Sequence, residues 1–231
     1  MRAGARRRHG RRFFVMTACQ PRPLCYRTAL TSFDENRQAK MINWRVQETI
    51  CGLDELSGHM DAGVTHLLSI LDPEVSEPGW FDAVPPRERL TLRFHDIIIP
   101  TPGQKMPEKA DMERVLAFGS TLPDGDPAHL LVHCHMGISR STAAATAILV
   151  QAHPDLSDDD ALAHIHQVRG KAWPNSVMIR HADELLGREG RLIAALGRFY
   201  RRRLAAQPHF AEPLRAGGRL RELEMAEAAE V

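Results

Sequence analysis

Residues 130–142 read LLVHCHMGISRST. The stretch opens as an apolar run typical of a buried strand, then passes through a cysteine between two histidines, a glycine and an arginine. From Ser141 to Gln151 the side chains are short and mostly apolar, which predicts a helix buried in the core. Residues 134–140 are therefore expected to form a short loop between the end of a strand and the N-terminus of a helix.

A loop in this position is suited to bind an oxyanion. Backbone N–H groups ahead of a helix N-terminus turn inward and form a nest for negative charge. Gly137 permits the positive φ angles that such a nest needs, and Arg140 offers a planar fork to two oxygens of a phosphate. Cys134 lies at the base of the nest, where dipole, amides and guanidinium all favour the thiolate. A thiolate facing a bound phosphate is placed for attack on phosphorus.

The rest of the chain predicts the surrounding fold. Four segments have the composition of buried strands and are bounded by turn-forming residues: 47–53, 64–71, 89–96 and 129–134. Helices are expected over 108–120, 141–151, 157–168 and 189–204, with one more capped by Asn175. This order predicts an α/β fold, a three-layer sandwich with a central, mostly parallel sheet of four to five strands flanked by helices. Ligands of such folds bind at the carboxyl ends of the strands, which is where residues 134–140 lie.

Composition divides the 231 residues into three parts. No acidic residue occurs before Asp34, and residues 1–40 are expected to be a basic, disordered extension. A transit-like peptide and an anion-binding arm are the alternatives, and Met16 and Met41 are alternative starts. A globular domain is expected over 41–205, followed by a tail over 206–231 that is a loose helix or disordered.

Charge and cysteine usage exclude several classes of protein. The formal net charge of +1 provides no strong field for nucleic acid or an anionic membrane. No apolar run approaches the roughly 18 residues that a membrane span needs. Four cysteines without a CxxC pair, at positions 19, 25, 51 and 134, argue against a disulfide framework and for a reducing, cytoplasmic location. The oligomeric state is left open.

HCHMGISRS at 133–141 resembles the HCxxGxxRS/T signature of the cysteine-based protein tyrosine phosphatases, most closely the dual-specificity type. The resemblance extends over about residues 45–190 and includes AWPN at 172–175, which is similar to a Pro-Asn segment of these enzymes. It implies a phosphatase domain over 41–205 that needs no cofactor. The implied roles are nucleophile for Cys134, phosphoryl binding for Arg140, help to the leaving thiolate for Ser141 and loop support for His133. Phosphate would be held by Arg140 and by the loop residues His135, Met136, Gly137, Ile138 and Ser139.

These enzymes also use an aspartate as general acid, because a phenolate is a modest leaving group. The residue that best matches the family's acid is Asp96, directly after the strand-like RLTLRF. The Pro- and Gly-containing segment 97–107 that follows could act as a lid. Asp111 is the reserve candidate, on a helix and expected to point to solvent, and Asp72 is expected to be a turn residue.

Other interpretations of these residues remain. Cys134 could be an inert buried cysteine, and zinc binding by His133, Cys134 and His135 suits no common tetrahedral spacing, so no metal is expected. Cys51 is expected to be a buried structural cysteine, the alternative being a protective disulfide with Cys134 as in some family members. The histidines at 95, 129, 164 and 166 are expected at strand ends or on solvated helix faces.

The loop also bears on the substrate. Phosphoinositide-directed relatives usually carry lysines within this loop, and here there are none. A phosphoprotein substrate is therefore expected, with phosphotyrosine first and phosphoserine or phosphothreonine left open, hydrolysed through a phosphocysteine intermediate. The alternative is a catalytically silent phosphate-binding module of the same fold.

Overall fold

The computed structural model describes residues 44–59, 62–77 and 88–229, together with Met1. The chain divides into two units, 1–38 and 39–231, and all described secondary structure belongs to the second. The expected basic extension over 1–40, the alternative starts at Met16 and Met41, and the cysteines at 19 and 25 lie outside the described residues.

Four parallel strands form the sheet of the described residues. They are β1 (Val46–Gly52), β2 (His66–Leu71), β3 (Glu88–Arg93) and β4 (Ala128–Cys134), in the order β1-β4-β2-β3. The two central strands, β2 and β4, are buried along their whole length, as expected of a parallel sheet covered on both faces. The predicted α/β fold with a parallel sheet is confirmed. The largest difference in bounds is at β3, which ends at Arg93, so that Asp96 lies beyond the strand.

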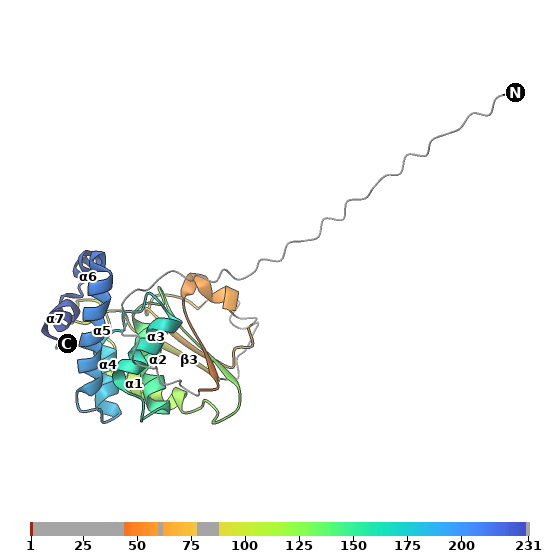
Figure 1. The fold of residues 1–231 in the computed structure, drawn as a ribbon, viewed down its shortest axis with the longest axis horizontal. Helices are drawn as coiled ribbons and strands as arrows, with labels where there is room; N and C mark the ends of the chain where they lie inside the picture. The colour runs from red at the N-terminus through yellow and green to blue at the C-terminus, as the bar shows by residue number, and fades with distance from the viewer. Residues whose placement is uncertain (2–43, 60–61, 78–87, 230–231) are drawn as a thin grey trace. The chain divides into compact units, whose positions relative to one another are not determined.

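Five helices pack on one side of the sheet: α1 (Lys109–Gly119), α2 (Arg140–Ala152), α3 (Asp158–Val168), α4 (Ser176–Leu185) and α5 (Arg191–Ala206). Helices α1, α2 and α3 contact the strands, and α4 and α5 pack on these helices (Figure 1). On the opposite face the 3₁₀ helix η1 (Leu53–His59) contacts β1 and β4, and its Leu56 is buried with Leu67 and Leu131. The second outer layer of the predicted sandwich is therefore a 3₁₀ helix in the described part of the chain.

Helix α2 lies at the centre of the helical layer. Every residue from Arg140 to Val150 is buried, so that the helix belongs to the core on all of its faces. Its small side chains, among them Ala143, Ala144 and Ala147, let α1, α3 and α4 pack around it. The N-terminus of α2, which follows the Cys134 loop, is thus held by a rigid part of the core.

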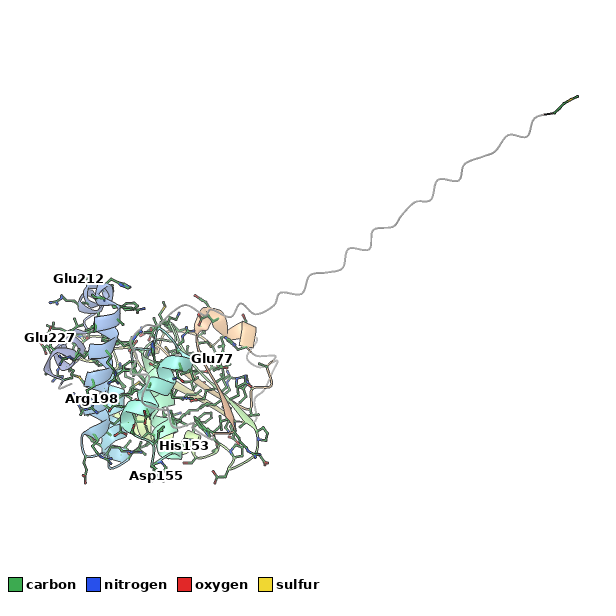
Figure 2. All side chains as sticks on the ribbon, viewed as in Figure 1. Glu77, His153, Asp155, Arg198, Glu212 and Glu227 are labelled. Atoms are coloured by element: carbon green, nitrogen blue, oxygen red, sulfur yellow. The ribbon has the colours of Figure 1, made fainter. Side chains whose placement is uncertain are left out.

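An ion pair joins the outer helix α5 to α3, which lies against the sheet. Arg198, which projects from α5 in Figure 2, donates two hydrogen bonds of 3.2 and 2.5 Å to Asp159 at the start of α3.

Among the described residues, no helix is both long and apolar enough to cross a membrane.

The segment after α5 belongs to the tail over 206–231, which was expected to be a loose helix or disordered. It forms η3 (Pro208–Phe210), α6 (Ala211–Ala216) and α7 (Leu220–Ala228), and α7 packs against α5 (Figure 1). The segment is ordered because α7 buries Leu223 and Ala226. Gly197 of α5 permits the close approach, since a Cβ there would lie 3.1 Å from the carbonyl oxygen of Met225.

Candidate active site

The signature loop (residues 134–140) joins the carboxyl end of the interior strand β4 to the N-terminus of α2. Its carbonyl groups are held by neighbouring segments: Leu53 N–H donates to His135 O at 2.9 Å and Trp173 N–H to Ile138 O at 2.8 Å. Asn175 N–H donates to Ser139 O at 3.3 Å. By contrast, no N–H group of residues 135–139 donates a hydrogen bond to another protein group within the described chain. The loop thus has five amide donors that find no acceptor among the described residues, as an oxyanion nest requires.

Gly137 takes a conformation that requires glycine. Its φ is +64°, and a Cβ at this position would lie 2.4 Å from the carbonyl carbon of Cys51 and 2.6 Å from its oxygen. The close approach joins the signature loop to the end of β1. Gly137 therefore provides both the left-handed turn and the space in which the loop packs.

Gly137→Ala is expected to lower the free energy of unfolding by more than the cost of an alanine in the left-handed conformation. The matched control is Gly187→Ala, where φ is +61° and nothing lies within 4 Å of the added Cβ. The control should lose about 1–2 kcal/mol, and Gly137→Ala a further ~1–3 kcal/mol because backbone must move. Urea unfolding measures both, and equal losses would show that the loop yields to the extra methyl group.

Cys134 lies at the base of the loop and is 2% exposed. Its Sγ is 3.3 Å from the Oγ of Ser141, in the first turn of α2, so that the hydroxyl can donate to a thiolate. His133 lies behind the loop rather than in it, with Nε2 2.7 Å from Ser69 Oγ on β2. Burial lowers the pKa of His133 to about 4, which keeps the imidazole neutral at pH 7 and suits the support role expected for it.

Arg140 is held by one end of its guanidinium. Nη1 donates to Asp72 Oδ1 and to the carbonyl oxygen of Phe94, both at 2.6 Å. Nε is buried and has no hydrogen-bond partner among the described residues. Asp72, expected to be only a turn residue, also pairs through Oδ2 with Nδ1 of His135 at 3.2 Å. The carboxylate of Asp72 thus orients Arg140 and leaves Nε for an anion.

Asp96 lies against the signature loop. Its Oδ1 accepts hydrogen bonds from Ser139 Oγ at 2.8 Å and Asn175 Nδ2 at 3.0 Å, and it pairs with Arg219 Nη2 at 2.5 Å. Burial acts to raise the pKa of Asp96, but the guanidinium groups of Arg219 and Arg140 outweigh it and hold that pKa below its usual value. About 30% of the side chain remains exposed. In this state Asp96 is a carboxylate.

The reserve candidate, Asp111, has a different role from the one expected. It is 6% exposed rather than directed to solvent, and its Oδ2 accepts the Glu108 N–H at 3.0 Å in a capping box at the start of α1. The carboxylate of Asp111 thus caps the N-terminus of α1.

The remaining candidates are occupied by structural contacts. Cys51 is a free, buried thiol, and burial together with Glu55 raises its pKa to about 12. The four histidines bind other groups: His95 the Lys105 N–H, His129 Thr49 and the Ala62 carbonyl, His164 Glu48, and His166 Arg203. No group of three or more His, Cys, Asp or Glu side chains within the described ranges could hold a metal ion.

A further pair that the sequence analysis missed fixes the loop from outside. Arg169 donates to Gly137 O at 2.9 Å and Met136 O at 3.2 Å, and pairs with Glu55 at 2.6 Å. Glu55 also accepts the Gly52 N–H at 2.7 Å, and this bond together with Arg169 lowers the pKa of Glu55 to about 2. The sequence signal for this contact is Gly52 at the end of β1, because a glycine in a strand often marks a site where another backbone approaches closely. A Cβ at Gly52 would lie 2.9 Å from the carbonyl oxygen of His135.

Comparison with known proteins places these features in context. No family model matches the chain. It is 30% identical over 122 residues to mouse (Mus musculus) dual specificity protein phosphatase 2, a match covering 52% of this chain and 34% of that protein. The chain thus spans about a third of the length of this curated relative. Over about half of its own length, the chain is similar in sequence to a dual-specificity phosphatase.

Solved structures were also compared with the chain. The phosphatase domain of Yvh1 from Chaetomium thermophilum is 21% identical, with 64% of this chain and 94% of that one covered and a TM-score of 0.42. Human DUSP28 is 22% identical, with coverage of 60% and 87% and a TM-score of 0.44.

Proposed function

We propose that this chain is a cysteine-dependent phosphatase that hydrolyses phosphate monoesters through a phosphocysteine intermediate. The observation that carries the proposal is the signature loop itself. Its carbonyl groups are bound by neighbouring segments, while the N–H groups of residues 135–139 have no protein acceptor within the described chain, around a cysteine that lies beside the start of α2. Arg140 adds a buried Nε without a partner in the described residues. These donors match the oxygens of a phosphoryl group.

The residues would divide the reaction between them. The loop amides and Arg140 bind the phosphoryl oxygens, and the Cys134 thiolate attacks phosphorus to form a P–S bond as the P–O bond to the leaving group breaks. Asp96 gives its proton to the departing oxygen. Water then attacks the phosphocysteine and gives up its proton to the Asp96 carboxylate, while Ser141 donates a hydrogen bond to the departing thiolate. Phosphate leaves, and the enzyme returns to its starting protonation state.

The rim of the loop supports a protein substrate with an aromatic phosphate ester, phosphotyrosine at least. Met136 is 63% exposed and Ile99, in the segment after Asp96, is 42% exposed, so apolar side chains are available to a phenyl ring. The loop carries no lysine for additional phosphates. The name of the curated relative supports phosphoserine and phosphothreonine as further substrates.

The free thiols of Cys51 and Cys134 support a reducing, cytoplasmic setting.

Hydrolysis is expected to proceed in EDTA at an unchanged rate, because a thiolate and a guanidinium supply the nucleophile and the charge that metal ions supply in other phosphatases. The measurement is release of phosphate from phosphotyrosine peptides with and without chelator. Acid quenching of a single turnover, followed by mass spectrometry of the peptide that contains Cys134, should reveal the phosphoenzyme. Loss of turnover in EDTA would contradict the thiolate mechanism.

A silent phosphate-binding module is the second candidate, and one observation favours it. Asp96 is paired with Arg219 and close to Arg140, so that its proton is absent in the resting state. An enzyme must restore this proton when the substrate dianion binds, whereas a binding module need not. Phosphate binding without any hydrolysis of phosphotyrosine peptides would establish the module and reject the enzyme.

A further inference from the structure

We propose that Arg219, from the C-terminal segment, is a positioning residue of the active site that fixes the Asp96 carboxylate against the signature loop. Its Nη2 contacts Asp96 twice, at 2.9 Å to the backbone carbonyl and at 2.5 Å to Oδ1. The side chain of Arg219 is 10% exposed, so solvent screens this ion pair less than a surface pair. Because the role depends on Asp96 as general acid, it rests on the function proposed above.

Arg219 is itself fixed by a buried glutamate. Glu222, in the first turn of the helix α7 that Arg219 precedes, is fully buried and accepts hydrogen bonds from three donors: Arg219 Nη1 at 3.3 Å, Trp173 Nε1 at 2.6 Å and the Ser176 N–H at 2.9 Å. Trp173 in turn donates its backbone N–H to the signature loop. Glu222 therefore joins Arg219 to the same segment that holds the loop.

The surroundings of Asp96 show what the charge of Arg219 does. The charged and titratable groups that act on Asp96 come from three helices: Arg140 of α2, Arg219 at the start of α7, and Tyr200 of α5, a neutral phenol whose pKa is raised well above its usual value, chiefly by burial. Glu222 faces Arg219 rather than Asp96. Of the two guanidinium groups near Asp96, that of Arg219 lowers the pKa of Asp96 more. Its positive charge stabilises the carboxylate relative to the carboxylic acid.

Two consequences follow for catalysis. Arg219 keeps Asp96 at the loop edge, where a leaving oxygen would emerge. It also lowers the pH at which Asp96 loses its proton, so that protonation must be driven by the dianion of a bound substrate. An aspartate fixed in this way would give its proton chiefly when a phosphoryl group occupies the loop.

The test is Arg219→Gln, which keeps a hydrogen-bond donor near the Asp96 carbonyl and removes the charge. Hydrolysis of aryl phosphates with poor leaving groups should fall on the order of 10–100-fold, because the acid is no longer held in place. The alkaline limb of the kcat/KM profile should move to higher pH, because the Asp96 pKa rises when the positive charge is lost. A merely structural role would lower the rate without moving that limb.

Three further variants provide the controls. Arg219→Lys restores a charge and should return the alkaline limb toward its wild-type position. Arg221→Gln removes an exposed charge from the same helix, two residues away, and should change neither rate nor limb. In an Asp96→Asn background, Arg219→Gln should cause little additional loss, because Arg219 acts through Asp96.

A direct readout does not depend on activity. Titration of the Asp96 carboxyl by ¹³C NMR in the full chain, assigned with Asp96→Asn, should show a higher pKa in Arg219→Gln, and the uncharged Arg219→Met serves if the glutamine variant does not fold. An unchanged Asp96 titration and an unchanged alkaline limb would overturn the role of Arg219. Failure of the proposed function looks different, because wild-type protein would then release no phosphate while the NMR shift persisted.

Discussion

Cys134→Ser is expected to abolish phosphatase turnover, with a loss in kcat/KM on the order of 10⁴-fold or more, as when other enzymes lose a covalent nucleophile. The reason is chemical rather than structural. A serine hydroxyl is scarcely ionised at neutral pH, while the thiol it replaces is placed beside the loop amides and 3.3 Å from Ser141. Because the two side chains differ by one atom, the loop should keep its shape.

Two measurements separate chemistry from folding. Inorganic phosphate should raise the melting temperature of Cys134→Ser about as much as that of wild type, since the loop amides and Arg140 remain. Cys51→Ala removes the other described thiol, which is buried and lies outside the loop, and should retain turnover. Activity of Cys134→Ser within tenfold of wild type would refute the nucleophile assignment.

Asp96→Asn is expected to slow hydrolysis of phosphotyrosine by about 10²–10⁴-fold, the usual contribution of a general acid. The loss should grow with the pKa of the leaving phenol, because a poor leaving group needs a proton as its bond breaks. An acidic phenol can depart as the anion and should be affected far less. Asparagine can keep the hydrogen bond from Ser139 but has no proton to give, so the geometry is largely preserved.

Rates plotted against leaving-group pKa for wild type and Asp96→Asn provide the measurement. The variant should show the steeper dependence, and its kcat/KM profile should lose the alkaline limb while keeping the acidic one. In wild type, the alkaline limb of kcat should lie at higher pH than that of kcat/KM, because a bound dianion opposes the effect of Arg219 and Arg140 on Asp96. Equal slopes for the two proteins would place the acid elsewhere.

The parts of the molecule that are encoded locally could be predicted from sequence. The strand that ends at Cys134, the loop at Gly137 and the helix that begins at Arg140 follow one another along the chain, and each has its own pattern of apolar, turn-forming and small residues. The cap at Asn175 was likewise indicated within a few residues, and its side chain accepts hydrogen bonds from two helix N–H groups in the structure.

The contacts that orient the site could not be predicted, because their partners are far apart in sequence. Arg140 and Asp72 are separated by 68 residues, Arg169 and Glu55 by 114, and Arg219 and Asp96 by 123. In the sequence, Arg169 and Arg219 resemble any surface arginine until the fold places a carboxylate beside each of them, and nothing near Arg140 in sequence indicates Asp72 as its partner. The buried Glu222 is a further case, because its partners Trp173 and Ser176 lie 49 and 46 residues away along the chain.

The buried position of Glu222 also constrains how related sequences can diverge. Loss of one partner from a buried charge pair leaves the other charge uncompensated and costs about 3–5 kcal/mol, whereas replacement of the whole group by apolar residues is tolerated. Arg219 and Glu222 should therefore be inherited together or lost together, along with Trp173, whose indole donates to the same carboxylate. In related proteins that lack Arg219, Glu222 and Trp173, Asp96 must pair with another cation or with none. The pH optima of those proteins should therefore differ from the pH optima of relatives that keep the three residues.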